Sequence, residues 1–266
     1  MRRGYFTIII AIIGFVFLYA PIVSLVVFSF NESRLVTVWT GFSLRWYASL
    51  FNDSQVVAAG LLSLQIAAVS ATIATVLGTL AGIALTRIGT FRGKTALTGM
   101  VSAPLVMPEV ITGLSSLLLF VSMEALIGWP GGRGFTTITI AHSTFCMAYV
   151  TVVVRSRLVD MDRSLDEAAM DLGATPLRVF FDITLPIIAP ALIAGWLLAF
   201  TLSLDDLVIA SFVSGPGSST LPMVIFSKIR LGVSPDVNAL ATIIIAIVAI
   251  GVVAATIIGA RRQSNA

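Results

Sequence analysis

Three carboxylates lie within otherwise apolar runs and are the first candidates for chemistry in this sequence. Glu109 follows Pro104 and Pro108, while Asp205 and Asp206 stand side by side late in another run. A carboxylate inside a membrane costs several kcal/mol unless it faces a cavity or a partner, so each is a functional hypothesis. Carboxylates at different depths suit a long cation, whose charged groups need partners once water is removed. The alternatives are pairing with a neighbouring helix and a neutral, protonated state.

The expected depth of these groups separates their roles. At 1.5 Å per residue, Glu109 lies about 18 Å along a helix that begins near residue 97, close to the midplane. Asp205 lies about 27 Å along a helix that begins near residue 187, close to the outer boundary. Adjacent helical residues point about 100° apart, so we expect Asp205 to line a path and Asp206 to meet a sister subunit or a helix-end group. Trp196 and Phe200 can add cation–π attraction to this path, with simple packing as the alternative.

Enzymatic chemistry has little support in the sequence. His142 is the one histidine and Cys146 the one cysteine, and both lie in apolar runs without a nucleophile–base pair. We expect His142 to be a packed or interhelical polar residue, and Cys146 to be a buried thiol that acts as a small hydrophobe. The chain has no Walker A sequence and so cannot itself be an ATPase. We therefore predict no catalytic residue, no metal site and no cofactor bound by this chain.

The composition indicates the elements that position these residues. The chain is 58% hydrophobic and 11% charged over 266 residues, and its mean hydropathy is +1.03. A run of about 20 apolar residues is long enough to cross a bilayer as a helix. We predict an all-α, polytopic membrane protein that forms a single domain over 1–266. The six predicted transmembrane helices cover about 5–30, 59–86, 97–123, 137–156, 187–213 and 238–260. Prolines in the third and fifth spans predict kinks.

The basic residues predict the orientation of these spans. Eleven of the 16 lysines and arginines fall on the side that holds both termini, the 87–96 turn and the 155–186 loop, which places both termini in the cytoplasm. They flank the apolar runs and do not form a stripe, so we expect a lipid membrane and no nucleic acid as their partner. The apolar start of the chain is predicted to be a retained signal anchor. The outer loops at 31–58 and 214–237 are long enough to hold short interfacial helices.

The 155–186 loop has the sequence pattern of two short helices. Ser164 followed by Glu167 predicts a capping box, and Gly173 is placed where a helix would stop. Thr175 and Pro176 predict the start of a second helix. The loop is therefore either a pair of interfacial helices that links two spans or a docking surface for a cytoplasmic partner.

The order of residues in this loop resembles the EAA loop of binding-protein-dependent ABC importer permeases. The matching elements are Glu167, Ala168, Ala169, Gly173 and the Ile-Thr-Leu-Pro run at 183–186. In that family the first short helix is a coupling helix that sits in a groove of the ATP-hydrolysing subunit. The resemblance implies a set of ATPase-coupling residues: Ser164, Glu167, Ala168, Ala169, Asp171 and Gly173.

The resemblance extends over nearly the whole chain. The stretches NESRLVTVWTGFSLRWY, APLVMPEVITGLSSLLLF and LSLDDLVIASFVSGPGSSTLPMVIFSKIR resemble the inner-membrane permeases of spermidine/putrescine importers. This likeness implies the type I ABC importer permease fold, polyamine import, and a place in the bacterial cytoplasmic (inner) membrane. It also implies four kinds of associate: a sister permease in a heterodimer, two ATPase subunits, ATP and Mg on those subunits, and a periplasmic polyamine-binding protein.

Two other hypotheses remain open at this point. An ABC importer could carry another cargo, such as an anion or ferric ion, although the intramembrane acids argue against anions. The chain could instead be a secondary transporter or channel that works without ATPases. Such transporters often contain paired, interrupted spans in two repeated halves, and this sequence has no visible duplication.

Overall fold

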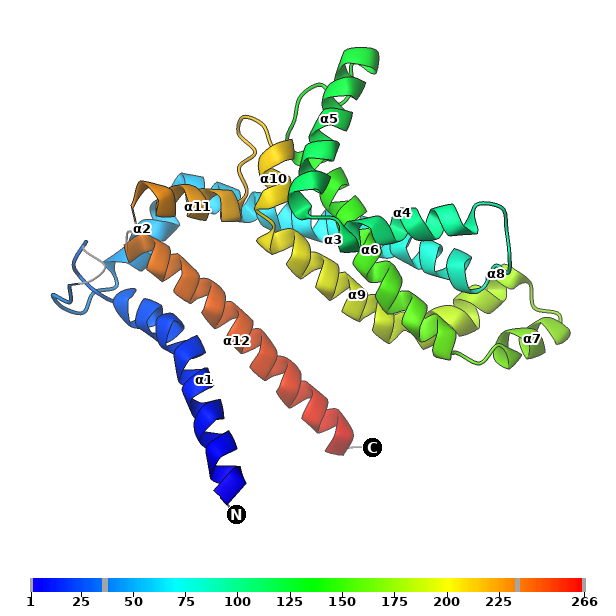
Figure 1. The fold of residues 1–266 in the computed structure, drawn as a ribbon, viewed down its shortest axis with the longest axis horizontal. Helices are drawn as coiled ribbons and strands as arrows, with labels where there is room; N and C mark the ends of the chain where they lie inside the picture. Colours follow the sequence, from blue (N-terminus) through cyan, green and yellow to red (C-terminus); the bar gives the residue numbers. More distant parts are fainter. Residues whose placement is uncertain (1, 35–37, 233–234, 265–266) are drawn as a thin grey trace. The chain divides into compact units, whose positions relative to one another are not determined.

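The computed structural model describes residues 2–34, 38–232 and 235–264 (Figure 1). Within these ranges the long regular elements are helices, which confirms the all-α prediction. Five segments are long and apolar enough to cross a membrane: Phe6–Phe28, Ser54–Thr86, Glu109–Ile127, Phe135–Asp160 and Pro176–Asp205. The sixth predicted span falls in α12, Pro235–Ser264, whose apolar part is described over Pro235–Ile250.

The contacts of the chain group into two compact units. Unit 1 contains Met1–Val57 and Val224–Ala266, and unit 2 contains Ala58–Met223. Whether 1–266 behaves as the predicted single domain stays a prediction.

Unit 1 contains the two terminal helices and short helices from the predicted outer loops. Its elements are α1 (Arg2–Phe28), α2 (Arg45–Asn52), most of α11 (Leu221–Leu231) and α12. Because α2 lies within 31–58 and α11 within 214–237, both loops hold the short helices that their lengths suggested. Buried Asn31 organises the segment before α2. Its side chain binds the carbonyl of Val38 (2.7 Å) and the amide of Thr40 (3.1 Å), and its own carbonyl accepts the Trp46 indole N–H (2.7 Å).

A single lysine ties three elements of unit 1 together. The Lys228 Nζ atom of α11 donates to Asp53 Oδ2 at 2.8 Å and to Asp236 Oδ2 at 2.9 Å. Asp53 also caps the start of α3 (Ser54–Thr86), since its Oδ1 accepts the amide N–H groups of Gln55 and Val56. The hydrogen bond from Lys228 lowers the pKa of Asp53 more than its partial burial raises it. Burial lowers the pKa of Lys228, but the two carboxylate hydrogen bonds outweigh it and the net pKa is raised.

These opposite shifts predict a stability plateau. Asp53 stabilises the fold above its ordinary pKa of 3.8, and that contribution is lost as the pH falls through the lowered folded pKa. Lys228 stabilises it below its ordinary pKa of 10.5, and that contribution is lost as the pH rises through the raised folded pKa. We therefore expect Lys228→Met to lower the thermal midpoint of the purified protein most near pH 7. The difference from the wild type should shrink below about pH 4, and a difference that is constant with pH would contradict this assignment.

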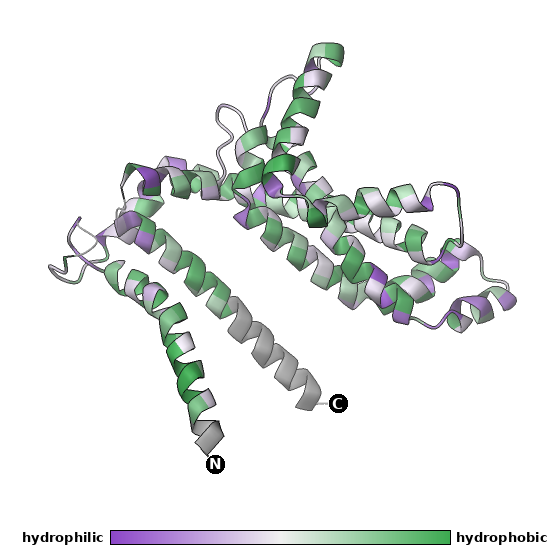
Figure 2. Cartoon of the chain, viewed as in Figure 1, coloured by the Kyte–Doolittle hydropathy of each residue, from purple (hydrophilic) through white to green (hydrophobic). Residues whose placement is uncertain are grey.

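Unit 2 contains the remaining helices. Besides most of α3, they are α4 (Lys94–Val106), α5 (Glu109–Ile127), α6 (Phe135–Asp160), α7 (Ser164–Asp171), α8 (Pro176–Val179), the π-helix η1 (Phe180–Thr184), α9 (Leu185–Asp205) and α10 (Val208–Val213). Hydrophobic residues dominate α3, α5 and α9, while hydrophilic residues gather at α7 and in the turn before α4 (Figure 2).

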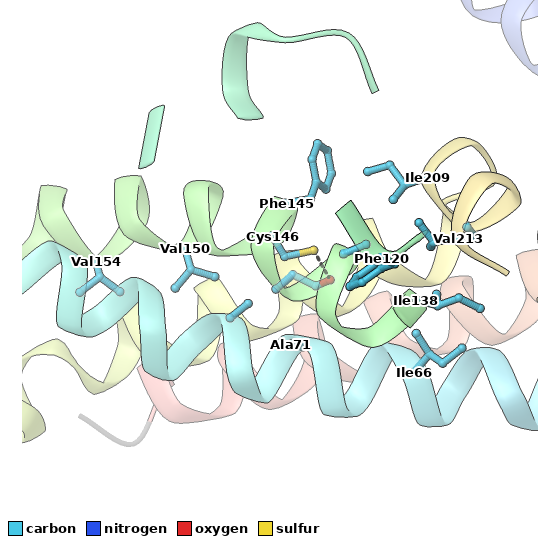
Figure 3. Close-up of a cluster of buried hydrophobic side chains, with 14 of the residues drawn as sticks. Ile66, Ala71, Phe120, Ile138, Phe145, Cys146, Val150, Val154, Ile209 and Val213 are labelled. Carbon is cyan, nitrogen blue, oxygen red and sulfur yellow. Dashed lines mark hydrogen bonds between the residues drawn. The ribbon is translucent and has the colours of Figure 1, made fainter. Parts of the chain in front are cut away.

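Helix α6 is the central element of unit 2. Its most apolar window is 67% buried, against 39% for α3 and 22% for the span that contains α9. Figure 3 shows buried side chains of α6, among them Ile138, Cys146 and Val150, packed with residues of neighbouring helices. Cys146 is fully buried, and its thiol donates to the carbonyl of Ala199 on α9 at 3.5 Å. It is therefore a core residue, as predicted.

Two glycines let the helices approach α6 closely. A Cβ atom at Gly78 of α3 would lie 2.9 Å from Val150 Cβ, and one at Gly195 of α9 would lie 3.3 Å from Val150 Cγ1. Small residues at such positions are how membrane helices gain close backbone packing. Val150 therefore fills a site between two glycine-lined helix faces.

We expect Gly78→Val to destabilise unit 2, because its side chain has no room against Val150. Overpacking of this kind costs about 1–3 kcal/mol, which should lower the thermal midpoint of the detergent-solubilised chain by several degrees. Gly60→Val is the matched control on the same helix, since a Cβ there meets no atom within 4 Å. Equal effects of the two substitutions would contradict the close packing of α3 on α6.

The third predicted span is broken, which corrects its expected course over 97–123. Helix α4 ends at Val106, Met107 is extended (φ −78°, ψ 138°), and α5 begins at Glu109. Pro108 has no N–H to donate, and its ring keeps the preceding residue out of the helical region. A break therefore replaces the expected kink, and Glu109 stands in the first turn of a new helix.

The fifth predicted span ends early in the same way. Helix α9 stops at Asp205, Asp206 is extended (φ −65°, ψ 124°), and α10 follows at Val208. The expected helix over 187–213 is thus two helices. The Asp206 carboxylate accepts the amide N–H groups of Ile209 and Ala210 in the first turn of α10, and these bonds stabilise the break locally.

Candidate functional site

The acids of the predicted substrate path lie at two helix breaks on packed elements. Glu109 begins α5, Asp205 ends α9, and Asp206 follows in the break before α10. Gly113, one turn beyond Glu109, allows α5 to meet α10 closely. A Cβ there would lie 2.7 Å from Phe212 Cδ2 and 3.3 Å from Ile209 Cα. The two breaks therefore lie at the ends of helices that pack against each other.

Asp206 is held in a buried polar cluster. Its Oδ2 accepts the Ala210 amide at 2.7 Å and lies 3.1 Å from His142 Nε2, and its Oδ1 accepts the Ile209 amide at 3.3 Å. The other ring nitrogen of His142 lies 2.7 Å from Ser203 Oγ. His142 is thus the interhelical polar residue that was expected, and Asp206 meets a helix end, one of the two partners predicted for it. A place for Asp206 on the path stays a prediction.

Glu109 and Asp205, in contrast, are exposed on the surface of the chain. Neither forms an ion pair within the part of the chain that the structure describes. These two groups are available to a ligand or a partner chain, and Asp206 is not.

The two aromatic residues of the predicted path form a stacked pair on α9. The rings of Trp196 and Phe200 lie 5.3 Å apart at 14°, and the Trp196 indole N–H donates to Thr72 Oγ1 at 3.1 Å. Both side chains are half-buried and pack on the core. Trp196 also lines a shallow apolar groove of about 440 Å³ with Leu192, Ile193 and Leu197. Both rings therefore pack partly on the core, as the alternative interpretation expected, and part of each ring remains exposed.

The first helix of the cytoplasmic loop begins as predicted but without the predicted capping box. Helix α7 starts at Ser164, and no side chain of its N-cap residue, Arg163, bonds the helix. Instead the Asp162 carboxylate accepts the Ser164 amide at 2.9 Å, and this bond, with one from the Ser164 hydroxyl, lowers the pKa of Asp162. Because Ser164 occupies the first helical position, its hydroxyl is not placed ahead of the helix to cap it.

The end of this helix matches the prediction for Gly173. Its φ is +86°, a value that favours glycine. The Gly173 amide binds the Met170 carbonyl at 2.9 Å, and the Ala174 amide binds the Ala169 carbonyl at 3.1 Å. These two bonds form a Schellman motif, which ends the helix. Thr175 then precedes Pro176 at the start of α8, as expected.

The loop presents polar and apolar groups on its outside. Of the predicted coupling residues, Ala169 is half-buried and the others are exposed: Ser164, Glu167, Ala168, Asp171 and Gly173. Leu172 is 90% exposed and Leu177 72% exposed. The loop therefore leaves two large apolar side chains exposed beside its polar groups.

Sequence reasoning missed how the inner side of this loop is held. Nothing in the sequence indicated that Arg87 pairs with Asp166, yet their side chains form an ion pair at 3.4 Å. Arg163 Nη2 also donates to the Thr86 carbonyl at 2.8 Å. These partners are 77 or more positions apart in the chain, so no local pattern could have paired them.

The fold resembles that of solved ABC importer permeases. Two structures of a bacterial ABC transporter for the acidic polysaccharide alginate match with TM-scores of 0.75 and 0.72, at 17% and 18% sequence identity. The first match covers 97% of this chain and 94% of that chain, and the second covers 94% and 90%. The second transporter was solved with an alginate-bound periplasmic protein. At this identity the likeness shows the fold, which is the predicted type I permease fold.

Sequence similarity places the chain within a family. Residues 74–262 match the family model described as the inner membrane component of binding-protein-dependent transport systems, and the chain belongs to that family. It is 62% identical over 248 residues to the putrescine transport system permease protein PotI of Escherichia coli K12, covering 93% of this chain and 88% of PotI. It is 42% identical over 258 residues to the spermidine/putrescine permease PotC of the same organism, covering 97% and 93%. The relatives are transport permease subunits of the inner membrane, and the predicted importer class is confirmed.

Proposed function

We propose that this chain is a permease subunit of an ABC importer that moves polyamines, putrescine or spermidine, into the cytoplasm. The observation that carries the proposal is its 62% identity to a putrescine permease over 93% of its length. This similarity extends over 248 residues, a longer stretch than residues 74–262, which the family model matches. The protein takes no part in ATP chemistry itself and acts as the transport subunit.

The substrate path in this proposal uses the two exposed carboxylates. Glu109 and Asp205 stand at breaks on packed neighbouring elements and make no ion pair within the described chain. A linear polyamine carries ammonium groups several bonds apart, so two separated anions can hold both ends of it. The open face of the Trp196–Phe200 stack adds cation–π attraction along α9. Asp206 supports the site indirectly, since it holds the start of α10 in place.

The coupling part of the proposal assigns ATP hydrolysis to a separate subunit. That subunit binds ATP and Mg, and it seats α7 in a groove that covers the exposed side of the loop. Leu172 and Leu177, which face outward here, are then buried on docking. Closure of two ATPase subunits moves the loop and rocks the helices between inward-open and outward-open states.

The remaining partners follow from the same proposal. A sister permease completes the path, and a periplasmic polyamine-binding protein delivers substrate to the outer loops that contain α2 and α11. Both termini then lie in the cytoplasm, because the side with eleven of the 16 basic residues is the cytoplasmic side.

Copurification and energy dependence test the proposal against its alternatives. The chain should copurify with an ATPase subunit and a second permease, and uptake should stop when ATP is depleted. Transport that continues without an ATPase would favour a secondary transporter. ATP-driven uptake of another cargo, with no response to polyamines, would keep the importer class and overturn the substrate.

A further inference from the structure

The inner side of the cytoplasmic loop is held at a carboxylate that contacts two membrane helices at once. Asp166 of α7 forms the ion pair with Arg87, and its Oδ1 accepts the Thr184 hydroxyl at 3.3 Å. Arg87 directly follows α3, and its amide N–H binds the Ile83 carbonyl at 2.7 Å. Thr184 is the last residue of η1 and directly precedes α9. One side chain therefore joins the coupling helix to the cytoplasmic ends of α3 and α9.

A second contact fixes the start of α7 to the same helix end. Arg163 Nη2 donates to the carbonyl of Thr86, the last residue of α3, at 2.8 Å. The last carbonyls of a helix have no partner within the helix, so this guanidinium satisfies a group that would otherwise need water. Arg163 thus binds the last residue of α3 and Asp166 binds the residue that follows it, and the two contacts together restrict how α7 can turn relative to that helix.

The Arg87–Asp166 pair is more protected than an ordinary surface ion pair. The side chains of Arg87 and Asp166 are 15% and 20% exposed, against 75% and 62% for the Arg178–Asp182 pair in the same loop. Two nitrogens of Arg87, Nε and Nη2, are buried without a hydrogen-bond partner among the described residues. If Asp166 lost its charge, the largely buried Arg87 guanidinium would lose the carboxylate with which it pairs. A protected pair is screened less than an exposed one.

The loop also changes helix type where the contact is made. Residues 180–184 form a π-helix between α8 and α9, and such segments interrupt the regular ladder and often lie at functional sites. Thr184 is buried at the end of this segment. A displacement of α7 that passed only along the backbone would have to cross Gly173 and the π-helix before it reached α9. The side-chain contacts of Asp166 with Arg87 and Thr184 provide a more direct route.

We propose that Asp166 is a positioning residue that transmits movement of the coupling helix directly to α3 and α9. The inference rests on the proposed function, because it assumes that α7 is moved by an ATPase subunit. The outer side of α7 binds that subunit, and Asp166 on the inner side passes the displacement to two helices that pack on α6. Arg87 and Thr184 are the receiving groups.

The test compares coupling in reconstituted complexes, measured as ATP hydrolysed per substrate molecule imported. Asp166→Asn keeps the shape and an acceptor for Thr184 but removes the charge. It should raise this ratio about fivefold, the low end of typical coupling effects, while binding of the ATPase subunit is unchanged. Arg87→Gln should do the same. The double variant should also show about fivefold, because both changes remove one contact. Asp182→Asn, which removes the exposed pair, is the control and should leave the ratio unchanged.

Each outcome decides between transmission and a merely structural role. A structural role would lower the yield of assembled complex and leave the ratio per assembled complex at the wild-type value, which would overturn the proposal. Effects that multiply to about twenty-five-fold in the double variant would also overturn it. If Asp166→Asn does not assemble, Thr184→Val keeps the ion pair and removes only the link to α9. It should raise the ratio at least about twofold, the low end of what one hydrogen bond contributes, and an unchanged ratio would contradict the proposal.

The wild-type complex separates the two levels of inference. If it shows no ATP-dependent polyamine uptake, the proposed function fails. If it imports normally and the Asp166 variant behaves like the Asp182 control, only the transmission role fails.

Discussion

A complex that carries Gly173→Val should still hydrolyse ATP but import at least about tenfold less substrate. Gly173 has a φ of +86°, and a residue with a side chain pays roughly 1–2 kcal/mol in this region, more if it is β-branched. A valine would therefore weaken the Schellman motif and release the end of α7. About 1.4 kcal/mol corresponds to a tenfold change in an equilibrium. Uptake and ATPase activity of the same proteoliposomes measure the separation.

The surroundings of Gly173 provide a clean control. A Cβ atom there meets nothing within 4 Å inside the chain, so any effect of valine comes from the backbone and not from an internal clash. Asparagine tolerates the left-handed region, and Gly173→Asn should keep most of the uptake. An equal loss in both variants would contradict the backbone account, and normal uptake in the valine variant would count against the docking role of the loop.

Glu109→Gln should reduce polyamine uptake about tenfold or more while assembly stays normal. The substitution keeps the size of the side chain and removes its charge. Glu109 is exposed and makes no ion pair within the described chain, so the substitution breaks no ion pair that stabilises the fold. An ammonium group on the path, however, loses a charged hydrogen-bond acceptor, a bond that contributes about 1.5–3 kcal/mol. Initial uptake rates of labelled putrescine, divided by the amount of assembled complex, measure the effect.

Another carboxylate on the same helix serves as the comparison. Glu124 is exposed near the end of α5, and its backbone carbonyl accepts the Gly128 amide N–H at 2.9 Å. Its side chain has no role in the proposed path, so Glu124→Gln should leave uptake near the wild-type rate. Equal uptake by the Glu109 and Glu124 variants would remove Glu109 from the path.

The fold was largely predictable because hydrophobic runs and local capping rules determine it. Apolar length located the helices, and Gly173 and Pro176 marked the ends of the loop helices correctly. The two broken spans were not predicted. At Pro108 the reason is that a proline in a membrane helix is compatible with both a kink and a break, and at Asp206 no proline marks the break. At Pro108 the extended Met107 ends the helix, and at Asp206 the carboxylate binds the first amides of α10.

The candidate site was predictable in residue type but only partly in arrangement. Glu109 and Asp205 stood out because carboxylates in apolar runs are rare. Their placement at breaks on neighbouring helices depends on the close approach of Gly113 to Phe212, a contact across 99 positions that no periodicity reveals. The His142–Asp206 and Arg87–Asp166 contacts also join residues far apart in the chain. Sequence patterns identify helices well, and they do not specify which polar side chains meet between them.

Uptake of labelled putrescine and spermidine by the reconstituted complex tests the central proposal most directly. Proteoliposomes should contain this chain, its sister permease and the ATPase subunits, with the periplasmic binding protein and ATP supplied on their respective sides. We expect polyamine accumulation that requires both ATP and the binding protein and that falls in the Glu109→Gln variant. Accumulation without ATP, or ATP-driven transport that ignores both polyamines, would contradict it.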